Sequence, residues 1–144
     1  MNIEQQYQAS CFCGAVKFSV STQPILMAYC HCDSCRHWSA GPVSAFTLWK
    51  PETLTVTQGE DQIDSYKKTP GSVRKWCRTC GGHLFTEHPE MCVIDVPAAV
   101  IPELSFKPAL HVHYQESVQP IAAGLPKMKD LPAEAGGSGD LIPE

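Results

Sequence analysis

The sequence predicts a small, mostly β domain with metal-binding turns. Three observations lead to this prediction. Apolar and polar residues alternate along most short segments, which is the period of a half-buried strand. Glycine, proline and aspartate separate these segments, in turns such as "TPGS" and "EHPE". Seven of the eight cysteines stand in closely spaced groups, a pattern that in a reduced protein is typical of metal ligands.

Alternation marks the individual strands. In "AVKFSV" it places Val16, Phe18 and Val20 on one face, and in "SAFTLW" it places Phe46 and Leu48 on one face. Further strands are predicted at "ILMAYC", "TLTVTQG", "QIDSYKK", "SVRKWC", "HLFTEH", "MCVIDV" and "ALHVHYQ". Only "DSCRHWSA", residues 33–40, has the character of a helix, about two turns long with Asp33 or Ser34 as its N-cap.

The length of the chain predicts one domain. A chain of 144 residues buries roughly 68–70% of its unfolded surface, which is enough for a core without disulfides. We therefore expect residues 1–144 to form a single zinc-binding domain. From Gly124 onward, "GLPKMKDLPAEAGGSGDLIPE" is rich in proline, glycine and alanine. This composition predicts a loose or surface-wrapping C-terminal tail over residues 124–144.

Composition also limits the compartment and the partners. The start "MNIEQQYQAS" has no basic residues followed by an apolar run, so we expect no standard export signal. No segment approaches the roughly 18 apolar residues of a membrane span. The net charge is −4 and the eleven Lys and Arg are scattered, whereas a phosphate-backbone binder needs a basic patch. The expectation is a cytoplasmic protein that binds neither nucleic acid nor membrane. Its oligomeric state is not predicted.

Two cysteine motifs have the spacing of a closed metal site. Zinc takes thiolates at about 2.3 Å in a tetrahedron. In "CRTCGG", Cys77 and Cys80 can curl around a metal because the following glycine tolerates the required backbone conformation. In "CFCG", an extended segment would point Cys11 and Cys13 to one face. Four thiolates from these motifs would complete one site.

The stretch "YCHCDSC" then supplies three thiolates alone, those of Cys30, Cys32 and Cys35. Three protein ligands and a vacant position are typical of a catalytic zinc, where water or substrate takes the fourth place. Spacing alone does not establish which motifs pair.

Other residues could complete this second site and make it purely structural. Strand alternation points His31 away from its cysteine neighbours, which makes it a poor ligand candidate. His37 lies two residues past Cys35 and could reach the metal as a ligand, or it could be a surface residue. Cys92, between Met91 and Val93, is expected to be a small buried apolar residue, with the alternative that it is the fourth thiolate.

Three further histidines and one arginine are weaker candidates for the site. His83 follows "CRTCGG" directly and is expected to be structural. His111 and His113 would share one face of a strand, where an exposed polar face is the commoner arrangement than a metal site. Arg36 follows Cys35 and could form either a surface ion pair or a bidentate contact with a substrate carboxylate.

The motifs "CFCGAVKF", "YCHCDSCR", "WCRTCGGHLF" and "ALHVHY", in this order, resemble the glutathione-dependent formaldehyde-activating enzyme (GFA) family, which also contains centromere protein V. The resemblance runs from Cys11 to the carboxyl end. It implies a β-tent fold of coiled antiparallel sheets. It also implies two zinc ions, a structural one and a catalytic one. The structural zinc would be held by Cys11, Cys13, Cys77 and Cys80, and the catalytic zinc by Cys30, Cys32 and Cys35.

The chain departs from the family in two places. Family members often carry a glycine four residues beyond the "CR" arginine, where this chain has Ala40. A tryptophan frequent after the "H-x-x" strand is also missing, since the local sequence is "QESVQPIAAG". Both departures concern the surroundings of the expected pocket rather than the ligands.

The resemblance implies a carbon–sulfur lyase whose reaction combines glutathione with formaldehyde to S-hydroxymethylglutathione. The expected partner is therefore a small-molecule thiol, which zinc coordination would deprotonate. Two other functions stay open. One is a zinc-stabilised binding module, for which a basic extension would be the sign, and this acidic chain has none. The other is a redox sensor that uses the thiols of "CHCDSC".

Overall fold

The computed structural model describes residues 5–122 and 124–143, and over these residues it contains ten β-strands and one α-helix. The mostly β fold class predicted from the alternation is confirmed. The chain divides into two compact units. The first comprises the residues up to Ile25 together with Thr47–Phe106, and the second comprises Leu26–Phe46 together with the residues from Lys107 onward.

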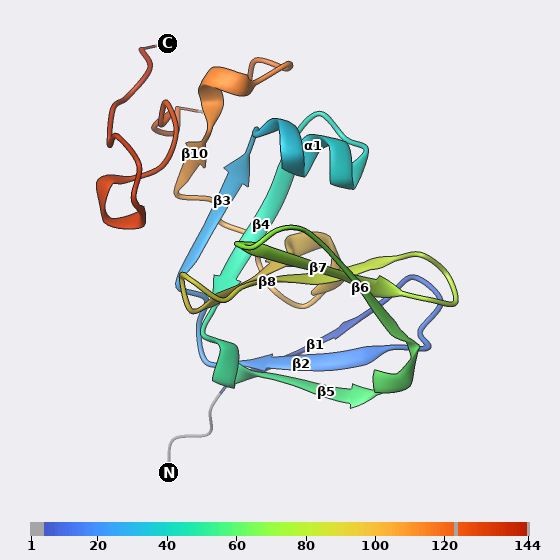
Figure 1. Cartoon of the computed structure of the whole chain (residues 1–144). Coiled ribbons are helices and arrows are strands. Elements are labelled where there is room, and N and C mark those ends of the chain that lie inside the picture. Colours follow the sequence, from blue (N-terminus) through green and yellow to red (C-terminus); the bar gives the residue numbers. More distant parts are fainter. Residues whose placement is uncertain (1–4, 123, 144) are drawn as a thin grey trace. The chain divides into compact units, whose positions relative to one another are not determined.

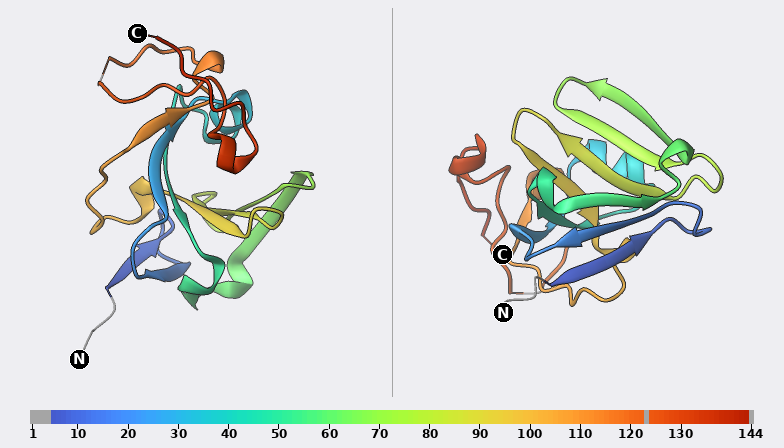
Figure 2. Two further views of the ribbon diagram at one scale, coloured as in Figure 1. Left: turned by 90° about the vertical axis from the view of Figure 1, so that its left-hand side faces the viewer. Right: turned by 90° about the horizontal axis from the view of Figure 1, so that it is seen from below.

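The first unit contains two sets of hydrogen-bonded strands. A three-stranded antiparallel sheet has the order β1-β2-β5. The strands β6, β7, β8 and β9 follow one another as antiparallel neighbours. In Figure 1 and in the right-hand view of Figure 2, β1, β2 and β5 form one layer and β6, β7 and β8 another. The strand bounds are β1 (Gln6–Ser10), β2 (Lys17–Ser21), β5 (Leu54–Gln58), β6 (Ile63–Thr69), β7 (Ser72–Cys77), β8 (His83–His88) and β9 (Val93–Pro97).

The core of this unit lies between the two layers. Val16, Phe18 and Val20 are fully buried, as their alternation predicts. The rings of Phe18 in β2 and Phe85 in β8 meet edge to face with 5.3 Å between their centroids, which joins the layers. Trp49 is also fully buried, and its indole N–H donates to Thr47 Oγ1 over 2.7 Å. These buried apolar side chains belong to one continuous core of the first unit.

Strand β1 was not predicted from the sequence. It carries the pattern of a half-buried strand, because Tyr7 and Ala9 are buried while the flanking glutamines are exposed. Its residues pair with β2 from Gln6 opposite Ser21 to Ser10 opposite Lys17. The signal was the alternation in "QYQAS", which is short and holds a single large apolar side chain.

The second unit contains β3 (Leu26–Cys30), the start of β4 (Ser44–Trp49), β10 (Leu110–Val112) and the helix α1 (Asp33–Ser39), all labelled in Figure 1. β10 pairs with β3 in parallel, with His111 opposite Tyr29 and Val112 opposite Cys30. This parallel pair is an exception to the antiparallel pairing that the resemblance implied. It brings the segment after residue 107 alongside the cysteine-bearing end of β3.

The helix lies within the predicted segment 33–40, but its N-cap differs from both predicted caps. Its N-cap is Cys32 rather than Asp33 or Ser34, and Cys32 Sγ accepts a hydrogen bond from the Cys35 backbone N–H. At the other end, Ala40 is the C-cap in the left-handed region, with φ 57° and ψ 34°. Within the described residues, no helix is long and apolar enough to cross a membrane.

The C-terminal segment is attached to β10 through its backbone. The N–H of His111 donates to Pro126 O, and the N–H of Met128 donates to His111 O. Met128 in turn forms an antiparallel bridge with Leu141. Short 3-10 turns complete the chain, at Pro51–Thr53, Glu60–Gln62, Ala98–Val100, Tyr114–Glu116 and Ala133–Ala135. The region predicted to be a tail thus has backbone contacts of its own.

Candidate metal centres

The first cysteine cluster lies in the first unit and contains Cys11, Cys13, Cys77 and Cys80, whose sulfurs all lie within 4.8 Å of one another. The Cys11 and Cys13 sulfurs are 3.7 Å apart, and those of Cys13 and Cys77 are 3.9 Å apart. Four thiolates at about 2.3 Å from a tetrahedral zinc would be separated by about 3.8 Å. The cluster therefore has the donor set and the spacing of a closed four-thiolate site.

The motif "CRTCGG" forms this site for the reason that its sequence suggests. Cys77 is the last residue of β7, and the chain turns back at once, since the N–H of Gly81 donates to Cys77 O over 2.7 Å. Gly81 has a φ of 76°, a conformation that glycine adopts without steric cost. The turn closes when the N–H of Cys77 donates to Gly82 O.

The motif "CFCG" reaches the same site by a different route from the one predicted. Cys11 and Cys13 lie in a turn after β1, not in an extended segment. The Cys11 N–H donates to Val16 O and the Gly14 N–H donates to Cys11 O, which curls the backbone around the sulfurs. Cys11 is buried and Cys13 is exposed. The expectation of two thiols on one face of a strand is therefore wrong, although the two thiols do converge.

Backbone N–H groups point at the sulfurs of this cluster. Val16 N donates to Cys11 Sγ over 3.3 Å, and Gly82 N donates to Cys80 Sγ over 3.3 Å. The N–H groups of Cys13 and Gly82 lower the pKa of Cys80 to about 6, because hydrogen bonds to a thiolate favour its charged form. Such donors stabilise the ionised state in which cysteine binds metal.

The second cluster lies in the second unit and contains Cys30, Cys32 and Cys35, with all three sulfurs within 4.8 Å of one another. Cys30 is the buried last residue of β3, Cys32 caps α1, and Cys35 lies in its first turn. Within the described part of the chain, no further Cys, His, Asp or Glu joins this group. Three convergent sulfurs fit the donor set of a zinc site with one open position.

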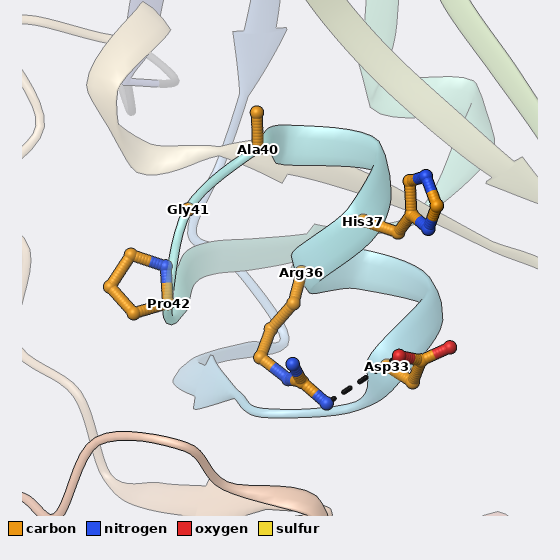
Figure 3. Close-up of a pocket in the computed structure, with 6 residues that line it drawn as sticks. All are labelled: Asp33, Arg36, His37, Ala40, Gly41 and Pro42. Atoms are coloured by element: carbon orange, nitrogen blue, oxygen red, sulfur yellow. Dashed lines mark ion pairs between the residues drawn. The ribbon is translucent and has the colours of Figure 1, made fainter.

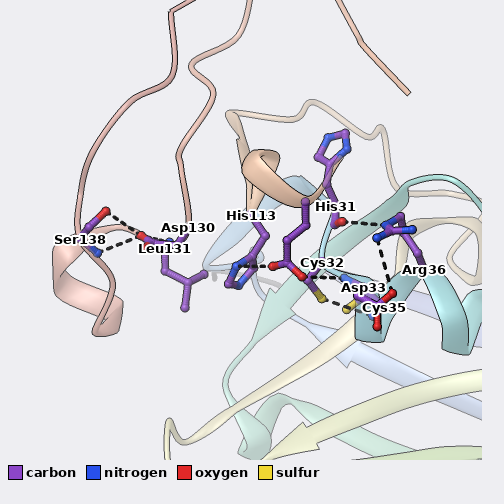
Figure 4. A network of polar contacts seen from close by, with 10 residues as sticks. His31, Cys32, Asp33, Cys35, Arg36, His113, Asp130, Leu131 and Ser138 are labelled. Atoms are coloured by element: carbon purple, nitrogen blue, oxygen red, sulfur yellow. Dashed lines mark hydrogen bonds and ion pairs between the residues drawn. The ribbon is translucent and has the colours of Figure 1, made fainter. Parts of the chain in front are cut away.

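Contacts within this cluster shift the pKa values of two of its thiols in opposite directions. Hydrogen bonds with Cys30 and Cys35 lower the pKa of the Cys32 thiol to about 2. The hydrogen bond with Cys32 raises the pKa of the Cys30 thiol, and so does the one with Cys35, and burial adds to the effect. The imidazole of His113 contributes the last part of the lowering at Cys32. Figure 4 shows Cys32 and Cys35 at the start of α1 with His113 nearby.

His31 does not join the cysteines, as strand alternation predicts. Its ring is fully buried and its Nε2 lies 2.9 Å from Nδ1 of His111. Burial, together with the charges of His111 and Arg36, lowers the pKa of His31 to about 4. The ring of His31 thus has the ring of His111 as its partner rather than a cysteine.

The prediction that His111 and His113 share an exposed polar face is wrong. His111 is fully buried and Val112 is the last residue of β10. His113 then takes a left-handed conformation with a φ of 53°, which ends the alternation. Its Nδ1 lies 3.5 Å from Oε2 of Glu116.

Glu116 is a residue of the site that the sequence did not reveal. Its Oε1 accepts a 3.0 Å hydrogen bond from the backbone N–H of Asp33, the first residue of α1. The two residues are 83 positions apart, so no local pattern indicates the contact. The carboxylate therefore attaches the cysteine-bearing helix to the chain after β10.

Arg36 holds the cysteine turn from its other side. Its Nε donates to His31 O over 3.0 Å, and its Nη2 lies 3.6 Å from Asp33 Oδ1. A hollow of about 280 Å³ lies beside Asp33 and Arg36, and Figure 3 shows the residues that line it. Helical spacing puts the hollow and Cys35 on different faces of α1. The hollow is lined by Asp33, Arg36, His37, Ala40, Gly41 and Pro42.

The last two candidates lie in the first unit. Cys92 is exposed in a turn, with a φ of 53° and its N–H donating to Pro89 O, and β9 begins only at Val93. The prediction that it is a buried apolar residue is wrong, because the strand starts later than its apolar neighbours suggested. Neither cysteine cluster of the described residues includes it. His83 begins β8 opposite Trp76, and burial lowers its pKa.

The fold and the two clusters define a small β protein with two groups of cysteines that could hold metal ions. The sequence pattern of the family described as "Glutathione-dependent formaldehyde-activating enzyme" matches residues 6–116. The chain belongs to this family, which confirms the resemblance drawn from the cysteine motifs.

Two further proteins are similar to this chain. An uncharacterized lyase of Schizosaccharomyces pombe is 26% identical over 80 residues, which are 56% of this chain and 56% of that protein. The matched part is thus little more than half the length of this relative. The crystal structure of a Rhodobacter sphaeroides protein has a TM-score of 0.55 at 21% identity, covering 68% of this chain and 90% of that one. This second likeness is one of fold.

Proposed function

We propose that this chain is a zinc-dependent carbon–sulfur lyase-type enzyme that acts on a small thiol or its adduct, with glutathione and formaldehyde as the substrate pair. The observation that carries the proposal is the three-cysteine cluster, whose sulfurs converge without a fourth His, Cys, Asp or Glu among the described residues. Membership of the family and the name of the lyase from S. pombe support it.

The two clusters would hold zinc ions with different roles. Cys11, Cys13, Cys77 and Cys80 would hold a structural zinc with a complete ligand set, and Cys30, Cys32 and Cys35 would hold the catalytic one. Zinc bound at the second cluster would supply the positive charge that deprotonates and orients a substrate thiol. Three thiolates already give that site a net negative charge, so orientation is the larger contribution.

The protein groups around the second cluster keep its ligands in place. Arg36 Nε binds the peptide oxygen of His31, which lies between two of the cysteines. Glu116 binds the first N–H of α1, and the Cys35 N–H donates to Cys32 Sγ over 3.2 Å. In the proposed reaction the thiol sulfur forms a bond to the formaldehyde carbon, the carbonyl π bond breaks, and the thiol proton ends on the new hydroxyl oxygen.

Exchange spectroscopy tests the proposal directly. The interconversion of glutathione and ¹³C-formaldehyde with S-hydroxymethylglutathione should be faster with the zinc-loaded protein than without it. Cys35→Ser should return the rate to the uncatalysed value, while His37→Asn, an exposed change on the same helix, should not alter it. If no acceleration is found with glutathione, cysteine or another small thiol, the chain is not such a lyase and a zinc-stabilised binding module becomes the better explanation.

A further inference from the structure

A buried pair of histidines lies next to the three-cysteine cluster and has no role in the reaction proposed above. The side chains of His31 and His111 are both fully buried. Their rings approach with Nε2 of His31 2.9 Å from Nδ1 of His111, which is hydrogen-bond distance. His31 is also the residue between Cys30 and Cys32, so its backbone position is tied to those of two of the three cysteines.

Aromatic rings enclose this pair. Tyr29 stacks on His111 with 5.1 Å between centroids, and Tyr114 meets His31 and His111 edge-on at 4.7 and 5.4 Å. The outer nitrogens, His31 Nδ1 and His111 Nε2, have no hydrogen-bond partner among the described protein groups. The mutual hydrogen bond is therefore the one polar contact of each ring within the described chain. Removing one member would leave the other buried without a partner, which is costly.

The pair joins the two strands that form the base of the cysteine cluster. His111 lies in β10 and His31 directly follows β3, and the two strands run in parallel with Val112 opposite Cys30. The His31 backbone N–H donates to Val112 O over 3.1 Å. A shift of β10 by one residue would exchange the faces of its side chains and break the imidazole contact. The pair consequently specifies a single register.

The register of β10 against β3 also affects the position of the third cysteine, Cys35. Beyond Val112 the chain turns at His113, and Glu116 binds the first N–H of α1. Since Cys35 lies in the first turn of α1, the position of β10 affects the helix as well as β3. Ligand orientation by residues outside the metal's own shell changes metal affinity by about 10- to 100-fold in known sites.

We propose that His31 and His111 are positioning residues of the three-cysteine centre. Their buried hydrogen bond sets the register of β10 against β3 and so holds Cys30 and Cys32 at ligand spacing. The inference rests on the assignment of a metal to this cluster, which is part of the proposed function, but not on the substrate or on any catalysis. Metal binding by the protein in the absence of any substrate thiol therefore tests the inference.

The experiment compares three substitutions of His111 in the full chain. Asparagine places an amide near the position of Nδ1, glutamine carries its amide one methylene further, and leucine removes the polar group. Each variant is titrated with cobalt(II), and the thiolate-to-cobalt charge-transfer bands separate the three-thiolate from the four-thiolate site. His111→Leu and His111→Gln should weaken cobalt binding at the three-cysteine site by about 10- to 100-fold. His111→Asn should restore most of the affinity.

The four-cysteine site is the internal control, since its binding should not change in any of these variants. His37→Leu is the matched histidine control, because His37 is exposed on α1 and belongs to neither cluster. Equal affinity in all variants would overturn the proposal, as would equal losses in the asparagine and leucine variants or equal losses at both metal sites. If His111→Leu does not fold, the comparison of asparagine with glutamine decides. The reaction and this inference can fail separately. If the His111 variants change cobalt binding as expected but the wild-type protein has no lyase activity, the proposed reaction is refuted and this inference is supported.

Discussion

The backbone N–H of Asp33 donates a 3.0 Å hydrogen bond to Oε1 of Glu116. This contact satisfies one of the N–H groups that a helix leaves unpaired in its first turn. A carboxylate at this end also interacts favourably with the helix dipole. The other oxygen of Glu116 lies 3.5 Å from Nδ1 of His113. One side chain thus links the start of the cysteine-bearing helix to the end of β10.

Glu116→Ala should loosen this helix. Loss of a capping acceptor costs about 0.5–2 kcal/mol of stability, and the second cysteine cluster should lose zinc to a chelator sooner than the first. Glu116→Gln keeps an acceptor oxygen and should lose less. Urea unfolding and chelator competition measure the two effects. Wild-type behaviour of the alanine variant would show that the contact does not hold the helix.

Cys77→Ser should remove the structural zinc. Cys77 is fully buried among the core residues and belongs to the four-cysteine cluster. Because binding energy at structural zinc sites is folding energy, we expect precipitation or a much lower melting temperature, with zinc falling from two ions to about one per chain. Elemental analysis and thermal unfolding provide the measurement.

Cys92→Ala is the matched control for this change. Cys92 is exposed and outside both clusters, so zinc content should stay the same and stability should change by no more than about 0.5 kcal/mol. A soluble Cys77→Ser protein with two zinc ions and an unchanged melting temperature would contradict the assignment.

Ala40→Gly should stabilise the protein. Ala40 has a φ of 57° and its N–H donates to Arg36 O at the end of α1. A residue with a Cβ is destabilised by about 1–2 kcal/mol in this left-handed region, whereas glycine is not. After allowing for the greater freedom of glycine in the unfolded chain, we expect a gain of roughly 0.5–1 kcal/mol.

Ala135→Gly gives the opposite expectation. Ala135 ends a 3-10 turn without a positive φ, so glycine there should destabilise by about 0.5–1 kcal/mol. Chemical denaturation of both variants measures whether each change raises or lowers the free energy of unfolding. A loss of stability in Ala40→Gly would mean that the alanine methyl group has a packing role that outweighs its strain.

His88 should make the stability depend on pH. Its Nδ1 lies 3.1 Å from Gly71 O and 3.3 Å from Ser72 Oγ, and its Nε2 lies 3.9 Å from Asp95 Oδ2. Burial, together with the charge of Arg74, acts to lower the pKa of His88. The nearby carboxylate of Asp95, together with the Gly71 carbonyl, outweighs them and raises the pKa of His88 above its ordinary value.

A group with a raised pKa in the folded state binds its proton more tightly there than in the unfolded chain. The stability it contributes is full below the unfolded pKa of about 6.5, and it is lost as the pH rises through the higher folded value. The stability difference between wild type and His88→Gln should therefore shrink between about pH 6 and pH 8. Urea unfolding across this range tests it, with Asp95→Asn expected to flatten the same dependence. A difference that grows with pH would refute the assignment.

Local patterns in the sequence determined most of the strands and the grouping of the cysteines. The alternation of Val16, Phe18 and Val20 is confirmed because a strand with one buried face must alternate. "CRTCGG" forms its turn because the two cysteines and Gly81 lie within five residues of one another, so the geometry depends on the local backbone alone. Membership of the family follows from the order of such motifs.

Tertiary structure alone decided the environment of the second cluster. His111 is buried because β10 pairs with β3 in parallel and meets His31, a residue 80 positions away. Glu116 accepts a hydrogen bond from the first N–H of α1 across 83 positions. Hydrophobic periodicity does not specify which strands pair or where a strand ends, since these outcomes depend on packing between segments far apart in the chain. For that reason the sequence identified the cysteines, and only the folded chain revealed the side chains that hold them in place.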